Sequence, residues 1–494
     1  MGPLDQALTD PRAADLVTHP FAELLRTVVL TQAQGWSSQR DVDLLRCDPA
    51  FRLAVSKRRG ESPLLPRRED SLEPEGLASQ PTLSRLMSAL SAEQNREGLQ
   101  RVLCTWAAHR TGVSAASPRK ELTLDLDSLP IEVHGHQAGS AYNGHYRECC
   151  FHPLIVSWEF GCFLGAMLRE GSVHTAAEAL PFVLPFLARA KSYARRVWLR
   201  MDAGFPSEPF LAGLEKRDYR YVARLKTNQR LERMALPHVE RIAMKDEPED
   251  RFHTIELEYA AKAWSRPRRV VLVIDECPDQ LFPRHFFLVT NASVTEANGS
   301  ALVKRYRRRG NTEKDYGEWL NTMDLSLSST NRPNESYRGG RPQRHGKPVD
   351  SFAVNEATLL VSLLAANLLH ATRVLGRRAH GQLTSRETFR KEVLKAAARV
   401  ARSSRYVTFW IVEIHAQQWT QVREQMQKMH PARGSPRLQA LPLQRRTQRG
   451  GEHKSEATLS GRGKGGGARC LTDLRSGTHP RRAITRSQKT QTAG

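Results

Sequence analysis

The sequence predicts a mixed α/β protein with helical flanks. From about residue 120, short apolar segments of strand length alternate with helical segments, which is the pattern of an α/β sheet. Residues 1–115 instead show helical apolar spacing, as at Phe21, Leu24, Leu25 and Val28. From residue 436 the chain is mostly polar, glycine and basic residues, so we expect a disordered basic tail over 436–494.

Residues 116–229 predict three strands, then helix, strand, helix and strand. In the first strand Leu122, Leu124 and Leu126 alternate with Thr123, Asp125 and Asp127, so the two sets occupy opposite faces. The later elements are strands at 153–158 and 162–168, a helix at 175–192, a strand at 197–201, a helix at 207–217 and a strand at 219–225. This order of elements is that of a ribonuclease-H-like core.

The following region differs in texture and predicts a β-rich insertion over residues 230–302. Its strand-like segments are 252–259, 269–274 and 285–290, with no long helix between them. Residues 303–435 return to helices and predict the rest of the core with C-terminal helices. There we expect helices from residue 311 and over 352–375, a strand at 405–414 and a helix at 417–429.

Composition points to a polyanionic partner. The 494 residues include 75 Lys and Arg but only 52 Asp and Glu, a formal net charge of +23. Such an excess is typical of proteins that bind nucleic acid. A membrane is disfavoured because the most apolar run, 357–369, is too short to span and contains Asn367. The N-terminus lacks a signal-peptide pattern and the seven cysteines are scattered, so we expect a reduced, cytoplasmic protein.

Three acids have the placement that metal-dependent phosphodiester chemistry requires. Asp127 lies on the first strand, Asp202 ends the strand 197–201, and Glu313 falls in the first turn of a helix that Asn311 would cap. Two divalent ions about 4 Å apart activate the attacking oxygen and stabilise the leaving one, and carboxylates are their usual ligands. Taken singly, each acid also fits a solvated edge, a turn or a helix dipole. Asp125 shares a face with Asp127 and is its rival.

Several motifs occur in an order known from one family. They are LDLDS at 124–128, HGHQAG at 134–139, YNG at 142–144, MDAGF at 201–205, YVARLK at 221–226, YRRRGNTE at 306–313 and the apolar stretch 352–369. With these motifs the chain resembles the DDE transposases of bacterial insertion sequences, most closely the branch numbered thirteen-eighty. The likeness covers residues 15–430.

The resemblance implies a ribonuclease-H-like core with a β-rich insertion and a catalytic, metal-binding triad of Asp127, Asp202 and Glu313. It favours Asp127 over Asp125, because the family's acid directly precedes Ser or Thr. It also implies two Mg²⁺ ions, for which Mn²⁺ substitutes. The related signature Tyr-x2-Arg-x3-Glu-x6-Lys is matched by Tyr306, Arg309 and Glu313, but Leu320 stands at the Lys position.

Other residues are candidates for DNA contact. Tyr306 and Arg309 could hold phosphates, since a guanidinium matches phosphate oxygens. Arg224 and Lys226 lie two apart at a strand end and could share a face toward DNA. Trp264 could stack on a flipped base, or simply pack beneath a hairpin. The helix that Ser79 and Pro81 begin could contact DNA, or be an ordinary bundle helix of the predicted N-terminal DNA-binding region.

The sequence therefore predicts a transposase that binds terminal inverted repeats, cuts at the element ends and joins the freed 3′-hydroxyl to target DNA. Its partners would be double-stranded DNA, both transposon ends and target, and a second copy of the chain in the DNA complex. We expect it in the bacterial cytoplasm, associated with the nucleoid. The alternatives are a metal-dependent nuclease without strand transfer and an inactive, DNA-binding remnant.

Overall fold

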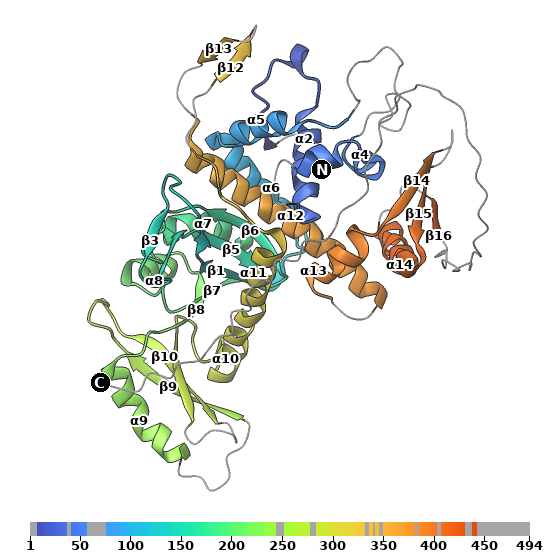
Figure 1. Cartoon of the computed structure of the whole chain (residues 1–494). Coiled ribbons are helices and arrows are strands. Elements are labelled where there is room, and N and C mark those ends of the chain that lie inside the picture. Colours follow the sequence, from blue (N-terminus) through green and yellow to red (C-terminus); the bar gives the residue numbers. More distant parts are fainter. Residues whose placement is uncertain are drawn as a thin grey trace, which may run out of the picture. The chain divides into compact units, whose positions relative to one another are not determined.

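The computed structural model describes most of residues 7–441 (Figure 1). The described ranges are 7–36, 41–56, 76–243, 251–276, 283–330, 335–338, 341–344, 349–380, 384–402, 407–429 and 437–441. The chain divides into a unit of residues 1–443 and a unit of residues 444–494. The second unit, and with it nearly all of the predicted basic tail, lies outside the described residues.

A mixed eight-stranded sheet is the centre of the first unit, which confirms the predicted α/β class. Its strand order is β6-β5-β1-β7-β8-β11-β10-β9. The strands are β1 (Arg119–Ser128), β5 (Leu154–Trp158), β6 (Cys162–Met167), β7 (Ala194–Met201), β8 (Arg220–Arg224), β9 (Arg251–Tyr259), β10 (Arg268–Glu276) and β11 (Arg284–Thr290). β1 pairs antiparallel with β5 and parallel with β7, and β7 pairs parallel with β8.

The alternation of β1 separates two cores. Leu122, Leu124 and Leu126 belong to the core that includes the apolar residues of α7 (Ala179–Lys191) and α8 (Glu208–Glu215). On the opposite face, Thr123, Asp125 and Asp127 are buried polar residues. That face is covered by α11 (Arg309–Met323), whose Tyr316 hydroxyl lies 3.0 Å from Ser157 Oγ on β5. The polar face of β1 is therefore turned toward α11.

The strands of the predicted insertion extend the same sheet. β11 pairs antiparallel with β8, and β10 lies between β11 and β9. The sequence predicts a β-rich insertion over 230–302 and gives no sign of the helix α9 (Gln229–Ala243), which precedes the first of its strands. Only Leu231, Ala235 and Ile242 of this helix are buried and Pro237 lies inside it, so its apolar pattern is sparse. α10 (Gly299–Arg307) then leads directly into α11.

The N-terminal region is helical, as predicted. It contains η1 (Ala14–Leu16), α2 (Phe21–Ala33), α3 (Asp41–Leu45), α4 (Pro49–Val55), α5 (Gln80–Leu90) and α6 (Glu93–Thr111). α5 begins as predicted, with Ser79 at the N-cap and Pro81 in the first turn. Its apolar face, which includes Leu83, Leu86 and Leu90, is buried in the core.

One long helix, α12 (Ser351–His380), joins the helical region to the sheet. It contacts α2, α5, α6 and β6. By length and composition residues 351–376 could cross a membrane, contrary to the short run expected from sequence, but 83% of that apolar window is buried. Asn367 inside it bonds the backbone N and O of Phe163 on β6, each at 2.8 Å. α12 is therefore a core helix and gives no sign of a membrane protein.

Smaller elements complete the described chain. They are the sheet of β2 (Ile131–Glu132), β4 (Glu148–Phe151) and β3 (Ala141–Asn143), the hairpin of β12 (Glu335–Arg338) and β13 (Arg341–Arg344), and, after α12, α13 (Arg386–Phe389), η2 (Arg390–Leu394), β14 (Ala398–Arg402), β15 (Val407–Val412), α14 (Glu413–Met429) and β16 (Arg437–Leu441). β15 and α14 match the strand and helix expected there, whereas β14 and β16 were not expected. Five cysteines in the described ranges (Cys47, Cys104, Cys149, Cys150 and Cys162) are free thiols.

A buried arginine fastens the added strands to α8. Arg268 on β10 is 4% exposed and bonds Glu208 at 2.6 Å and Glu215 at 2.8 Å. Burial alone would raise the pKa of Glu215, but hydrogen bonds from Arg268, Arg266 and Tyr221 outweigh it and lower that pKa to about 2. The ionised carboxylate is therefore strongly favoured in the folded protein.

We expect Arg268→Met to lower the free energy of unfolding by about 2–3 kcal/mol, because it removes the charged hydrogen bonds to Glu208 and Glu215, although Glu215 keeps those from Arg266 and Tyr221. Arg266→Met is the matched control, since Arg266 bonds the same Glu215 but is 61% exposed, and it should cost less than about 1 kcal/mol. The effect of Arg268→Met should shrink as pH falls from about 4.5 toward about 2, where Glu215 becomes protonated in the folded state. Urea unfolding measures both effects, and equal losses in the two variants would contradict this account.

Candidate active site

Asp127 and Asp202 lie side by side at the carboxyl ends of two parallel strands. The register of β1 and β7 pairs Asp125 with Arg200 and Leu126 with Met201. The next step along both chains brings Asp127 next to Asp202, which directly follows the last residue of β7. Parallel neighbours point their side chains to the same face, so both carboxylates lie on the face covered by α11.

Local backbone groups orient both acids. The Ser128 N–H donates to Asp127 Oδ1 at 2.9 Å, and the Gly204 N–H donates to Asp202 Oδ1 at 2.8 Å. A side chain at residue 204 would not fit, because a Cβ there would lie 2.8 Å from Thr175 Cγ2 and 3.1 Å from Asp202 Oδ1. The MDAGF motif thus forms a tight turn that presents Asp202.

The two acids share one electrostatic environment. Burial raises the pKa of Asp127 to about 6; the negative charge of Asp202 adds to this rise, and the positive charge of Arg309 opposes it. Asp127 is 7% exposed, so little water screens these charges. A cation placed between the two carboxylates would relieve their repulsion.

Glu313 and Arg309 complete the group from α11. The Arg309 Nη2 donates to Asp127 Oδ2 at 2.8 Å, and its Nε lies 3.1 Å from Glu313 Oε1. Burial would lower the pKa of Arg309, but the charges of Asp127, Asp202 and Glu313 raise it. The structure therefore brings the three predicted acids around one guanidinium, with Glu313 on the exposed side, where 58% of its side chain is accessible.

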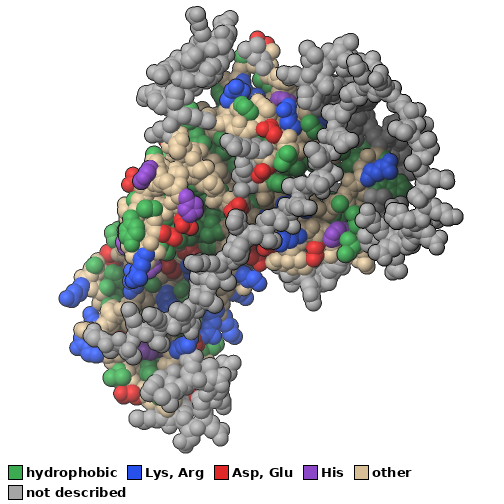
Figure 2. Space-filling view, in the orientation of Figure 1, with side chains coloured by type: hydrophobic (Ala, Val, Ile, Leu, Met, Phe, Trp, Pro, Cys, Tyr) green, Lys and Arg blue, Asp and Glu red, His purple; other side chains and the backbone are tan. Residues whose placement is uncertain are grey.

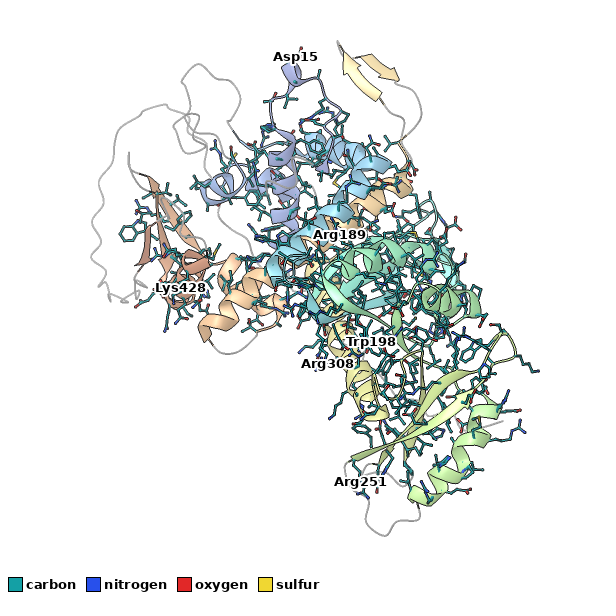
Figure 3. The ribbon with its side chains drawn as sticks, turned by 180° about the vertical axis from the view of Figure 1, so that it is seen from behind. Asp15, Arg189, Trp198, Arg251, Arg308 and Lys428 are labelled. Atoms are coloured by element: carbon teal, nitrogen blue, oxygen red, sulfur yellow. The ribbon has the colours of Figure 1, made fainter. Side chains whose placement is uncertain are left out.

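The start of this helix differs from the prediction. α11 begins at Arg309 with Arg308 at the N-cap, and Asn311 lies inside the helix rather than capping it. Glu313 is consequently one turn after Arg309, not in the first turn. Because α10 ends at Arg307 and α11 follows almost without a break, no side-chain cap is needed at this joint, which Arg308 marks in Figure 3.

Asp125, the rival first acid, is fully committed to a buried ion pair. Its Oδ1 lies 2.5 Å from Arg200 Nε and its Oδ2 lies 2.8 Å from Arg200 Nη2. Thr312 Oγ1 also donates to Oδ2 at 3.0 Å, and Asp125 is 0% exposed. Asp125 therefore links β1 to β7 and α11.

The acidic residues suit a hard divalent cation in chemistry but do not enclose one in this conformation. All three supply carboxylate oxygens, which Mg²⁺ prefers. Within the described ranges, however, no group of three or more His, Cys, Asp or Glu side chains is close enough to hold a metal ion. Arg309 uses one oxygen of Asp127 and one of Glu313.

The residues predicted to contact DNA lie in two places, one near the acids and one in the loop between β9 and β10. Burial is the main reason that the pKa of Tyr306 is raised. The charges of Arg309, Arg224, Asp202 and Glu313 also act on its hydroxyl, so Tyr306 lies near these residues. Arg224 and Lys226 are exposed, and the Arg224 guanidinium lies 5.4 Å from the centre of the Phe286 ring. Trp264 is half-buried in the loop between β9 and β10, where it contacts Tyr259 and Arg268. Its contacts are those of the hairpin-packing alternative.

Two further residues border the acids and were not signalled by the sequence. Burial raises the pKa of Tyr146 to about 12, and Asp127 and Asp202 contribute, so its hydroxyl lies near both. Arg169 is 3% exposed and donates to four backbone carbonyls, among them those of Thr175 at 3.1 Å and Ala177 at 2.7 Å. It fixes the loop that packs against Gly204. Only the folded contacts identify this role.

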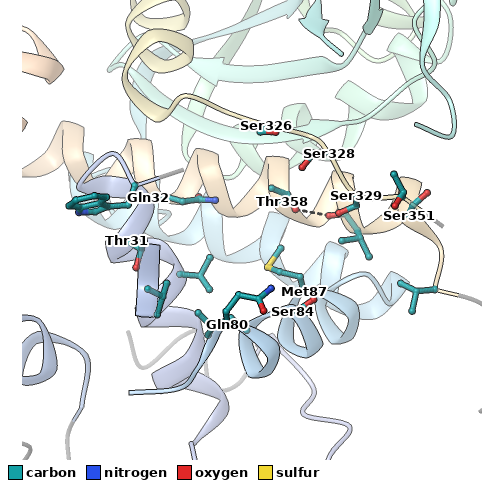
Figure 4. Close-up of a pocket in the computed structure, with 17 residues that line it drawn as sticks. Thr31, Gln32, Gln80, Ser84, Met87, Ser326, Ser328, Ser329, Ser351 and Thr358 are labelled. Atoms are coloured by element: carbon teal, nitrogen blue, oxygen red, sulfur yellow. Dashed lines mark hydrogen bonds between the residues drawn. The ribbon is translucent and has the colours of Figure 1, made fainter. Parts of the chain in front are cut away.

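A separate cavity of about 520 Å³ lies between α2, α5 and α12 (Figure 4). Hydroxyl and amide groups line much of it, including Thr31, Gln32, Ser84 and Thr358. None of the predicted site residues lines it, so it is distinct from the acidic site.

Asp125 and Asp202 should respond oppositely to replacement by asparagine. We expect Asp125→Asn to lower the free energy of unfolding by about 3–5 kcal/mol, because it leaves the buried Arg200 charge without its partner. Asp202→Asn should leave that free energy unchanged or raise it, because it removes a charge that repels Asp127. Urea unfolding of both variants tests this, and a comparable loss in Asp202→Asn would show that Asp202 has a structural role.

Comparison with known proteins places these residues in a family. The sequence profile of the family described as transposase DDE domain, group 1, matches residues 2–336. A search of curated proteins finds no match. The matched range includes the N-terminal helices, the whole eight-stranded sheet and the three acids. Because it spans more than half of the 494 residues, the chain belongs to the group 1 family of DDE-domain transposases.

Proposed function

We propose that this transposase binds the terminal inverted repeats of an insertion sequence and catalyses Mg²⁺-dependent cleavage and strand transfer. Asp127, Asp202 and Glu313 would be the metal ligands. The observation that carries the proposal is the convergence of these acids, from β1, the end of β7 and α11, on the single Arg309 side chain. Membership of the family supports a transposase, which acts on DNA and uses divalent metal ions.

The sheet topology supports a ribonuclease-H-like core. In the order β6-β5-β1-β7-β8, the first three strands are antiparallel neighbours and the next two add in parallel. The acids then lie at the carboxyl ends of the two central strands. The commitment of Asp125 to Arg200 supports Asp127 as the first ligand, because Asp125 could bind a metal only by breaking a buried ion pair.

The residues would share the work as follows. When bound, two Mg²⁺ ions, or Mn²⁺ in their place, activate the attacking oxygen and stabilise the leaving oxygen. The two aspartates, held by Ser128 and Gly204, fix the position of the reaction on the rigid sheet. Glu313, more exposed and on a helix, would approach from the DNA side. The same residues serve cleavage by water and then attack by the 3′-hydroxyl.

The surface around the acids is suited to DNA. Figure 2 shows Lys and Arg side chains gathered over the part of the molecule that holds β9, β10, α9 and α10. Exposed basic residues of this part include Arg224, Lys226, Arg230, Arg233, Lys262, Arg266, Lys304 and Arg307. Phosphate contacts of this kind give affinity without sequence preference. Tyr306 and Arg309 would contact the end nearest the acids, and a second copy of the chain would hold the other end.

Because Leu320 stands at the position of the signature Lys, an inactive remnant of a transposase is the alternative. Leu320 is a partly buried residue that packs against the core, so it cannot supply a charged phosphate contact. Against this, Asp127 and Glu313 both contact Arg309, and the charge of Asp202 acts on the same side chain. A remnant would bind element ends without cutting them, and a simple nuclease would cut without joining.

We expect Asp202→Asn to reduce cleavage of element-end DNA by about 100-fold or more, because a metal ligand is lost. Binding of the same DNA should stay within about threefold, since the basic surface is intact. Asp15→Asn, which changes an exposed Asp on η1, is the control and should cleave normally. Gel assays with end duplexes taken from the DNA flanking the gene measure both, and undiminished cleavage by Asp202→Asn would refute the assignment of the acids.

Strand transfer is tested separately with pre-cut ends and a target plasmid. We expect joined products that carry the 3′ end of the element, because the 3′-hydroxyl is the second nucleophile. Hydrolysis of the plasmid without joining would identify a nuclease instead. Binding without either reaction would identify a remnant.

A further inference from the structure

We propose that Arg309 is an internal counter-ion that holds the acidic site closed and exchanges its carboxylates for a DNA phosphate when a divalent cation binds. Cation binding and DNA binding would then be coupled through this one side chain. The inference rests on the proposed function and concerns the order of events at the same site.

The contacts of Arg309 place it where a cation would compete with it. It uses Asp127 Oδ2 and Glu313 Oε1, while Asp127 Oδ1 already accepts from the Ser128 N–H. A metal ion that bound Asp127 and Glu313 together would compete for the oxygens that already bind Arg309. The lack of a metal-holding group of three acids, among the residues described, agrees with this competition.

With both carboxylates bound, the Arg309 guanidinium still has one nitrogen without a hydrogen-bond partner in the described ranges. Its Nη1 is buried and makes no hydrogen bond with any part of the chain that the structure describes. A buried donor without a partner is unfavourable, because it has lost its hydrogen bonds to water and gained none in return. One guanidinium also cannot balance three carboxylates, whereas a divalent ion brings twice its charge to the same oxygens. Both facts favour exchange once a cation is available.

Once Arg309 is released from the acids, it can bind a DNA phosphate. Arg309, the exposed Arg224, Asp202 and Glu313 all act on the Tyr306 hydroxyl through their charges, so Tyr306 and the two arginines lie around one place. A guanidinium freed from two carboxylates presents a planar pair of donors that fits a phosphate. Glu313, mostly exposed and one helical turn away, would move without disturbing the core. DNA would therefore hold Arg309 out, and the cation would keep it out.

Linkage makes this testable without catalysis. If each ligand favours the released state, each must raise the affinity of the other by the same factor. We expect Arg309→Gln to bind Mn²⁺ about tenfold more tightly than the unaltered chain in the absence of DNA, because the competing charge is gone. Arg308→Gln removes a neighbouring charge that is 68% exposed, and it should change Mn²⁺ affinity less than about twofold.

Mn²⁺ affinity is measured by electron paramagnetic resonance of the free ion, with thermal unfolding as a check that each variant is folded. In the unaltered chain, a duplex of element-end DNA should raise Mn²⁺ affinity at least about fivefold, and this rise should be lost in Arg309→Gln. Arg309→Lys, which keeps the charge but cannot bridge two carboxylates, should bind Mn²⁺ with intermediate affinity.

Equal or weaker Mn²⁺ binding by a folded Arg309→Gln would overturn the proposal, and so would a DNA effect that persists in that variant. If Arg309→Gln is unfolded, the Lys variant decides, because affinity no higher than that of the unaltered chain would overturn the proposal. The proposed function fails in a different way: the unaltered chain and Asp202→Asn would then bind Mn²⁺ equally.

Discussion

The buried ion pair of Asp125 and Arg200 joins the two strands that carry the acidic site to the two helices that complete it. Arg200 grips both oxygens of Asp125 across the parallel register, and its Nη1 donates to the carbonyl of Arg305 in α10 at 2.6 Å. Thr312 of α11 adds a bond to the same carboxylate. With these contacts in place, Arg309 and Glu313 necessarily lie over the ends of β1 and β7. A buried pair of this kind stabilises little in itself, but an arrangement that separated its partners would leave a buried charge uncompensated.

The other contacts between α10 and the sheet also use charged side chains to fix the position of the helix. Arg305 bonds Thr123 and Glu121 on β1, and its guanidinium lies 4.1 Å from the centre of the Trp198 ring on β7. α10 is thus held to the sheet by arginines as well as by Leu302 and Val303, which are buried in a core cluster with Trp198 of β7. The chain has an excess of 23 positive charges, and here an arginine is paired with polar and acidic side chains of β1.

The sequence indicated much of this site because its pieces are local. Alternation in β1 shows that Asp125 and Asp127 share a face, and Asp202 stands at the end of an apolar strand. Neither pattern can tell which aspartate is paired with Arg200, because Arg200 lies 75 residues away. Similarly, YRRRGNTE identifies Arg309 and Glu313, but not that the arginine binds an acid on β1. The beginning of α11 was misplaced because the preceding helix, rather than a capping side chain, supplies its first turn.

If Asp127, Asp202 and Glu313 form one cation site, a bound ion lies close to all three of them. Replacing the cation with Fe²⁺ and adding ascorbate and peroxide generates radicals that cut the backbone next to the bound ion, and mass spectrometry maps the cuts. The account predicts cuts beside all three acids, each suppressed by excess Mg²⁺. Cuts near only one of them, or elsewhere along the chain, would contradict it.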